Sequence, residues 1–242
     1  MNLVVNFRKN GTKTPFLSRV LDGEDAYLGR PLTNSELAEE CMGGIFGGSG
    51  STANTFVYLL WAVLGHPDVH QKLKAELEAA FPDRSVMPDY VTCNKLPYLE
   101  AAITENMRRY PMLVAQLPRV AVTDAVVDGV HVPKGTVVGT QNYTTHRFET
   151  AFPNPEEYRP ERWLCKDDRL MREAFTPFSL GQRKCIGLNL AEMELRILAA
   201  AFFLRFEASL DPSMKQEDMH MYDMFNASPA GAKLWIKLKE VS

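Results

Sequence analysis

The pattern of hydrophobic and polar positions begins with a long stretch, residues 32–65, that predicts a single helix. Its second half, TFVYLLWAVL, is apolar on every side. Thr33 followed by Glu36 forms a capping box, which predicts where the helix begins. Gly65 and Pro67 predict its end. A helix of this length with apolar residues all round is typical of an element that runs through the interior of a protein.

The middle of this predicted helix is rich in glycine. Five glycines lie between positions 43 and 50. Each glycine in a helix interior costs about 1 kcal/mol relative to alanine. This cost predicts that another group must approach the helix backbone closely at this point.

Further along the chain, the hydrophobic period changes from helical to alternating. VHQKLKAELEAAF and LPYLEAAITENMRR are amphipathic, and Pro111 ends the second of them. RVAVTDAVVDGVHVPKGTVVGTQNY combines alternation, β-branched residues and turn signals, which predict short strands and hairpins. We therefore expect a lead-in over 1–30, a helix within 94–110, a β-rich segment over 115–150, an irregular segment over 151–187, a helix over 188–206 and a final strand over 232–239. The predicted fold class is mainly α with small β-sheets, in a single body.

Composition and charge exclude several classes of protein. The chain has 242 residues, 45% of them hydrophobic, and a net charge of −3. It is long enough for a real core, and it carries no basic run that would indicate nucleic-acid binding. The apolar run at the N-terminus is too short for a signal peptide or a membrane-spanning helix, so we expect a soluble cytoplasmic protein as written.

The four cysteines are too far apart for a zinc site or a disulfide framework. No two of them lie within C-x-x-C reach, and a reducing compartment is expected. Cys41, Cys93 and Cys165 are interpreted as buried structural cysteines. Cys185 differs because of the residues around it.

Glu105 and Arg108 lie three residues apart in ITENMRRYP, on one face of the predicted helix. An isolated E-x-x-R pair is usually a surface ion pair. Here the stop at Pro111 and the later PERW, with Arg162, favour a buried hydrogen-bonded network that locks a helix to an irregular loop. Such a role is structural, because a fully paired network leaves no group free for chemistry.

Cys185 lies in the pattern F-x-x-G-x-R-x-C-x-G, formed by Phe178, Gly181, Arg183, Cys185 and Gly187. The glycines permit a tight loop whose amides can point at the sulfur. The start of a helix directly after the loop favours thiolate over thiol. No histidine or acid lies beside the cysteine to serve as the base of a nucleophile. A lone thiolate suits the axial position of a haem iron.

Taken in order, GGSGSTANT, ENMR, PERW and FSLGQRKCIG resemble the C-terminal half of a cytochrome P-450, a haem-thiolate monooxygenase. The sequence is similar in character to fungal members of that family. The resemblance covers nearly the whole chain, as one partial domain over 1–242. It implies the α-rich triangular prism of that family, with haem b between the central helix and the cysteine-bearing helix.

The resemblance also implies roles for single residues. Cys185 matches the proximal iron ligand and Phe178 the ring beside the sulfur. Arg183 matches a partner of a haem propionate. Arg119 is either a second propionate partner or an exposed strand arginine, and both interpretations stay open. Glycines are implied at two places: Gly181 and Gly187 in the cysteine loop, and Gly47 and Gly48 against haem and O2. A structural triad is implied for Glu105, Arg108 and Arg162, and His146 is implied as a structural hydrogen-bonder. Substrate-lining or core positions are implied within 112–116 and 224–226, at Leu113, Val114, Ala115 and Phe225.

The implied reaction is hydroxylation of an apolar small molecule with O2, using electrons from NADPH through a reductase. The family usually places an acid and then a threonine in the central helix to relay protons. This chain has Gly50 and Ser51 there, followed by Thr52. Ser51 and Thr52, with ordered water, are therefore the candidate catalytic residues. A haem-thiolate isomerase or dehydratase, which needs no relay, remains open.

Relatives of this family are roughly twice as long as this chain. The front half that they carry includes a membrane anchor at the endoplasmic reticulum and the helices over the substrate pocket. The resemblance therefore implies a truncated form. An inactive fragment and a non-catalytic interaction module are the alternatives.

Overall fold

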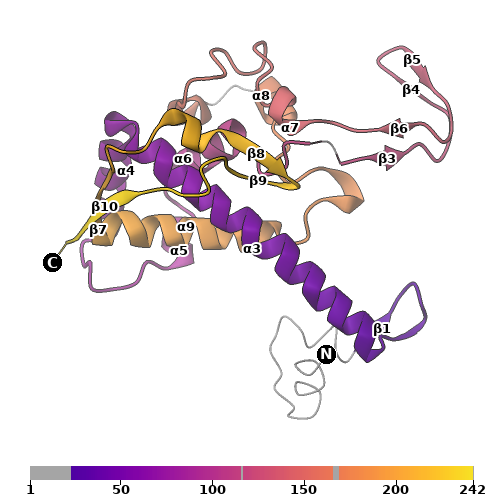
Figure 1. Cartoon of the computed structure of the whole chain (residues 1–242), viewed down its shortest axis with the longest axis horizontal. Coiled ribbons are helices and arrows are strands. Elements are labelled where there is room, and N and C mark those ends of the chain that lie inside the picture. The colour runs from indigo at the N-terminus through magenta and orange to yellow at the C-terminus, as the bar shows by residue number, and fades with distance from the viewer. Residues whose placement is uncertain (1–22, 116, 166–168, 242) are drawn as a thin grey trace. The chain divides into compact units, whose positions relative to one another are not determined.

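The computed structural model describes residues 23–115, 117–165 and 169–241, and Figure 1 shows how its helices and strands follow one another. The chain forms two compact units, a first unit of residues 1–50 and a second unit of residues 51–242. The long helix α3 (Asn34–Leu64) contributes residues to both. Of the predicted lead-in, residues 1–22 lie outside the described residues.

In the first unit, a short hairpin leads into α3. Strands β1 (Glu24–Asp25) and β2 (Arg30–Pro31) pair antiparallel. The Thr33 backbone N–H donates to Glu36 Oε2 (2.7 Å), and the Glu36 N–H donates to Thr33 Oγ1 (3.3 Å). The predicted capping box is confirmed. Hydrogen bonds from Arg30 and Thr33 lower the pKa of Glu36 to about 2, so this carboxylate stays charged at the positive end of the helix.

The second unit is mainly helical. Prolines open two of its α-helices at the first helical positions, where a missing N–H costs nothing. The α-helices are α4 (Pro67–Ala80), α5 (Tyr90–Cys93), α6 (Pro97–Arg109), α7 (Asn142–Thr145), α8 (Arg169–Ala174) and α9 (Leu188–Arg205), and the 3₁₀ helices are η1 (Pro160–Leu164), η2 (Gly181–Arg183) and η3 (Gln216–Met219).

Its strands form small antiparallel pairs rather than one large sheet. The pairs are β3 (Arg119–Val120) with β6 (Val137–Val138), β4 (Ala125–Val127) with β5 (Val130–Val132), β7 (Phe206–Leu210) with β10 (Ile236–Glu240), and β8 (Met221–Met224) with β9 (Asn226–Pro229). Asp128 and Gly129 lie in the stretch whose turn signals predicted hairpins, and they connect β4 to β5 with φ values of 49° and 79°.

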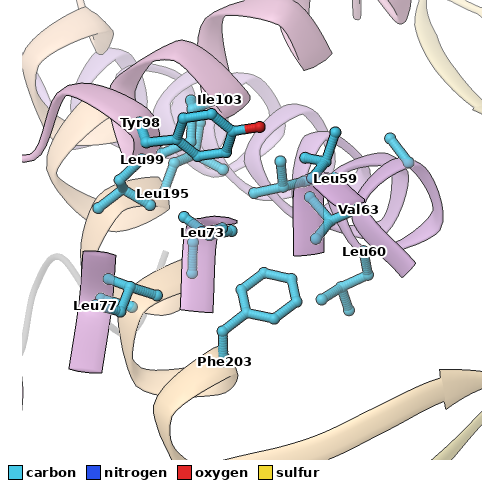
Figure 2. Close-up of a cluster of buried hydrophobic side chains, with 14 of the residues drawn as sticks. Leu59, Leu60, Val63, Leu73, Leu77, Tyr98, Leu99, Ile103, Leu195 and Phe203 are labelled. Atoms are coloured by element: carbon cyan, nitrogen blue, oxygen red, sulfur yellow. The ribbon is translucent and has the colours of Figure 1, made fainter. Parts of the chain in front are cut away.

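Four helices supply the main core of the second unit. Figure 2 shows side chains from the second half of α3, from α4, from α6 and from α9 packed together. They include Leu59 and Val63, Leu73 and Leu77, Leu99 and Ile103, and Leu195 and Phe203, all exposed by 2% or less. Burying each such side chain contributes about 1.5–3 kcal/mol. The apolar second half of α3 is thus buried as a core helix.

The predicted fold class, mainly α with small β-sheets, is confirmed. Helix α3 occupies 34–64 where the pattern predicts 32–65, and α9 occupies 188–205 where it predicts 188–206. Among the described residues, no helix is both long enough and apolar enough to cross a membrane.

Candidate functional site

The Glu105 carboxylate, on α6, lies at the centre of a buried hydrogen-bond network. Arg108, one turn along the same helix, donates from Nε to Glu105 Oε2 (2.8 Å) and from Nη2 to Oε1 (2.9 Å). Arg162, in η1, donates from Nε to Glu105 Oε1 (3.0 Å). All three side chains are buried. The structure therefore brings together the three charged residues that the sequence singled out.

Two further donors complete the network. Trp163 Nε1 donates to Glu105 Oε2 (2.9 Å), and the Arg159 backbone N–H donates to Oε1 (2.9 Å). Sequence reasoning missed both, although the position of Trp163 directly after Arg162 in PERW was a usable signal. A carboxylate offers about four acceptor sites. Five donors therefore leave no free lone pair for proton transfer.

His146 follows α7 and is fully buried. Its carbonyl accepts from Arg108 Nη1 (2.9 Å), and its Nε2 accepts from the Thr176 backbone N–H (3.0 Å). Burial, with smaller effects from the charges of Arg108 and Arg147, lowers the pKa of His146 to about 3. The imidazole is therefore neutral and acts as an acceptor. The prediction that His146 is a structural hydrogen-bonder is confirmed.

Cys185 lies in a loop that connects Phe178 to the start of α9. The Cys185 backbone N–H donates to Phe178 O (2.9 Å), which closes the loop. Gly181 has φ +73°, a conformation that glycine adopts without strain. A Cβ at Gly187 would lie 3.8 Å from Cys185 Sγ, and the cysteine side chain is exposed. The loop thus presents a single thiol outward.

The surroundings of this thiol are apolar and basic. Leu180 and Ile186 expose their apolar side chains on either side of it in the sequence. Arg183, at the end of η2, is also exposed. Phe178 packs instead against the main core, so the loop is anchored at its first residue.

A cavity of about 1200 Å³ reaches the cysteine loop. Ser179 and Leu180 of the loop line it, together with Arg119 of β3 and the predicted substrate-lining residues Leu113 and Ala115. The Arg119 guanidinium donates from Nη1 to Pro118 O (3.0 Å) and is exposed. Because Arg119 both lines this cavity and is exposed, it can be either a second propionate partner or an exposed strand arginine.

One backbone hydrogen bond ties the predicted substrate-lining segment 112–116 to Ala227 of β9, directly after the second such segment, 224–226. The Ala227 N–H of β9 donates to Met112 O (2.7 Å), and Asn54 Nδ2 of α3 donates to Ala227 O (2.9 Å). Phe225, at the tip between β8 and β9, has φ +77°, an unusual conformation for a residue with a side chain. Val114 and Phe225 are not among the described residues that line the cavity. Gln116 lies outside the described residues.

The remaining predicted residues lie on α3. Gly47 and Gly48 belong to the first unit, and a Cβ at either would meet no atom within 4 Å. Ser51 and Thr52 begin the second unit. The Ser51 carbonyl accepts from Thr55 Oγ1 (2.8 Å), and Thr52 is buried. The roles of all four stay predictions.

The interpretation of the other cysteines needs a correction. Cys93 is buried as predicted, and burial raises its pKa to about 11. Cys41 is only half-buried and Cys165 is exposed. Cys165 directly follows η1 at the surface, where its sulfur lies 3.8 Å from Glu161 O. It is therefore not a core residue.

Comparison with known proteins agrees with the fold. The family model described as Cytochrome P-450 matches residues 5–234. The chain therefore belongs to the cytochrome P-450 family. Cytochrome P-450 3A12 of Canis lupus familiaris is 36% identical over 69% of this chain, and cytochrome P-450 monooxygenase orf2 of Aspergillus niger is 37% identical over 80% of it.

Two solved structures share the fold of this chain. A crystal structure of a cytochrome P-450 matches 99% of this chain with a TM-score of 0.85 and 25% identity, and a cytochrome P-450 haem domain matches it with the same TM-score and 22% identity. The chain spans 33% and 39% of those two curated relatives, and 54% and 52% of the two structures.

The residues of the cysteine loop fit a haem group. The exposed sulfur of Cys185 can supply one axial ligand. The exposed side chains of Leu180 and Ile186 can contact an apolar macrocycle, and the guanidiniums of Arg183 and Arg119 can pair with carboxylates.

Proposed function

We propose that this chain is the haem-binding half of a haem-thiolate monooxygenase that hydroxylates an apolar small molecule. Cys185 is its iron ligand, and O2 and electrons from NADPH, delivered through a reductase, are its co-reactants. The observation that carries the proposal is the closed loop in which Cys185 presents an exposed sulfur beside Gly187 and ahead of α9. Haem with a thiolate ligand supplies the activation of O2, because the thiolate favours O–O cleavage.

The protein residues have separate tasks in this proposal. Phe178 holds the loop to the core and accepts the Cys185 N–H, so the sulfur is oriented before any cofactor binds. Arg183 and Arg119 pair with the two haem carboxylates. Leu113 and Ala115, on the cavity that reaches the loop, contact the apolar substrate. Ser51 and Thr52 pass protons towards the site through ordered water.

Reduced, carbon-monoxide-treated protein tests the assignment of Cys185. A strongly red-shifted Soret band arises only when a thiolate ligates the haem, so Cys185→Ser should abolish it. Cys165→Ser is the matched control, because Cys165 is the other exposed cysteine of the described chain, and this variant should keep the band. Retention of the band in Cys185→Ser would make the assignment wrong.

A second candidate is a haem-thiolate isomerase or dehydratase. It is favoured by one observation, the glycine at position 50 where the family usually carries the relay acid. If the protein is a monooxygenase, Ser51→Ala should lower the product formed per NADPH consumed, and Gly50→Asp should raise it. A chain that also carries the front half of its longer relatives is needed, because bulk water in an uncovered site would supply protons and mask both effects. Unchanged product per NADPH in both variants, with turnover of a peroxide substrate, would favour the second candidate.

A further inference from the structure

Thr176, two residues before Phe178, is held at three of its atoms. Its backbone N–H donates to His146 Nε2 (3.0 Å). Its carbonyl accepts from Asn142 Nδ2 (3.1 Å), and its Oγ1 donates to Asn142 Oδ1 (3.1 Å). Both partners are about thirty residues away in the sequence, at the two ends of α7. We call these three hydrogen bonds the Thr176 clamp.

The clamped residue opens the cysteine loop. The Ser179 N–H donates back to Thr176 O (3.0 Å), and the Cys185 N–H donates to Phe178 O (2.9 Å). Ser179 has φ +62°, a left-handed conformation that a serine keeps only when its surroundings enforce it. The position of Thr176 therefore sets the turn that carries Phe178 and, through it, the Cys185 backbone.

The other side of the clamp is tied to the buried Glu105 network. The His146 carbonyl accepts from Arg108 Nη1 (2.9 Å), and Arg108 pairs with Glu105. Because Nε2 of His146 accepts the Thr176 N–H, the ring proton is on Nδ1, which is buried and has no partner among the described residues. The imidazole thus leaves Nδ1 unpaired among the described residues, while its Nε2 accepts the hydrogen bond from the Thr176 N–H.

We propose that Asn142 and His146 are positioning residues that transmit the rigidity of the Glu105 network to Cys185 through Thr176. That this positioning of Cys185 serves an iron ligand rests on the proposed function. The clamp itself joins residues of the chain alone, so it orients the thiol in the haem-free protein as well.

Hydrogen exchange in the haem-free protein tests the clamp directly. Asn142→Ala removes the two bonds to Thr176 O and Oγ1, and should speed exchange of the Ser179 and Cys185 amides roughly 3- to 10-fold. Thr144→Ala is the matched control on the same helix, because its hydroxyl donates to Gln141 Oε1 instead (2.6 Å). It should leave both rates unchanged. Equal rates in Asn142→Ala and the wild-type protein would overturn the proposal.

A pair of substitutions at His146 separates positioning from bulk stability. Gln keeps an acceptor near the position of Nε2, whereas Leu removes it at similar size. His146→Leu should speed exchange of the Ser179 and Cys185 amides by roughly 3- to 10-fold, and His146→Gln should restore rates close to those of the wild type. If Gln and Leu behave alike, the acceptor role is wrong.

The two proposals fail in different ways. If the haem-loaded wild type lacks the red-shifted carbon monoxide band while exchange responds to Asn142→Ala, the iron-ligand assignment fails and the clamp stands. If the band is present but amide exchange responds neither to Asn142→Ala nor to His146→Leu, the clamp fails and the ligand assignment stands.

Discussion

Glu105 shows how a local spacing in the sequence can predict a tertiary feature at the residue scale. The three-residue separation from Arg108 placed both side chains on one helical face, and the later PERW predicted Arg162 as the third member, which η1 supplies. The indole N–H of Trp163 and the amide of Arg159 could not be deduced from spacing, because they depend on how the irregular segment folds back onto α6. The partners of Thr176 were invisible in the sequence for the same reason.

Loss of the Glu105 carboxylate should destabilise the second unit strongly. Glu105→Ala leaves two buried guanidiniums and two further N–H donors, those of Trp163 and Arg159, without their acceptor, which should lower the free energy of unfolding by about 3–5 kcal/mol. Urea unfolding followed by circular dichroism measures this change. Glu157→Ala is the control, because that carboxylate is exposed and lies 3.9 Å from Arg159. It should change the free energy of unfolding by about 0–0.5 kcal/mol, and a similar cost for both variants would contradict the network.

His146 should make stability depend on pH below neutrality. Its pKa is lowered by burial to about 3, whereas an exposed histidine has a pKa of about 6.5. The unfolded chain therefore takes up a proton between these values and the folded chain does not. The free energy of unfolding should fall as the pH drops from about 6.5 towards 3, by at most about 1.4 kcal/mol per pH unit from this group.

The variant His146→Gln isolates this contribution. Its unfolding free energy should fall less steeply between pH 6.5 and 5 than that of the wild type, because glutamine does not titrate. Urea midpoints at several pH values give both slopes. Identical slopes would show that His146 does not remain neutral in the folded protein.

At the scale of elements, long periodic helices were predictable and short ones were not. Amphipathic patterns indicated α4 and α6, and a helix was also predicted at the position of α9. In contrast, α7 and α8 lie inside segments predicted to be β-rich or irregular. The sequence of α7, NYTT, carries residues that favour strands. Tertiary contacts override that preference, because Asn142 bonds to Thr176, and Arg147 just beyond α7 donates to the Arg109 carbonyl.

The start of α6 depends on a side chain from another helix. Glu76 of α4 accepts from the Tyr98 N–H and from the Leu99 N–H, both at 2.8 Å, while Leu96 at the N-cap offers no side-chain bond. Glu76→Ala should therefore lower the free energy of unfolding by about 1–2 kcal/mol. Glu78→Ala, which removes a half-exposed pair with Arg84, should cost about 0–1 kcal/mol. Urea unfolding of the two variants decides whether Glu76 is a cap, since equal costs would leave no special role for it.

At the scale of the whole molecule, the alternation in the β-rich segment predicted strands but not their exposure. Alternation usually marks a sheet with one face covered by a core. Here the pairs β3 with β6 and β4 with β5 expose nearly all of their side chains. The register of β4 and β5 places Ala125, Val127, Val130 and Val132 on one face, and these four residues line the cavity of about 1200 Å³. The opposite face carries Val126 and His131.

The valine face of β4 and β5 should make the 242-residue chain self-associate. Contiguous exposed apolar surface favours association, at about 25 cal/mol for each Å² removed from water. Val127 is 61% exposed on the cavity face, and Val126 is 69% exposed on the other. Val127→Lys should therefore shift the protein towards monomer more than Val126→Lys does. Neither change should alter the free energy of unfolding by more than about 0.5 kcal/mol, because both side chains lie in water. Sedimentation velocity over a range of concentrations measures the association, and an equal effect of the two lysines would show that the cavity face is not the contact.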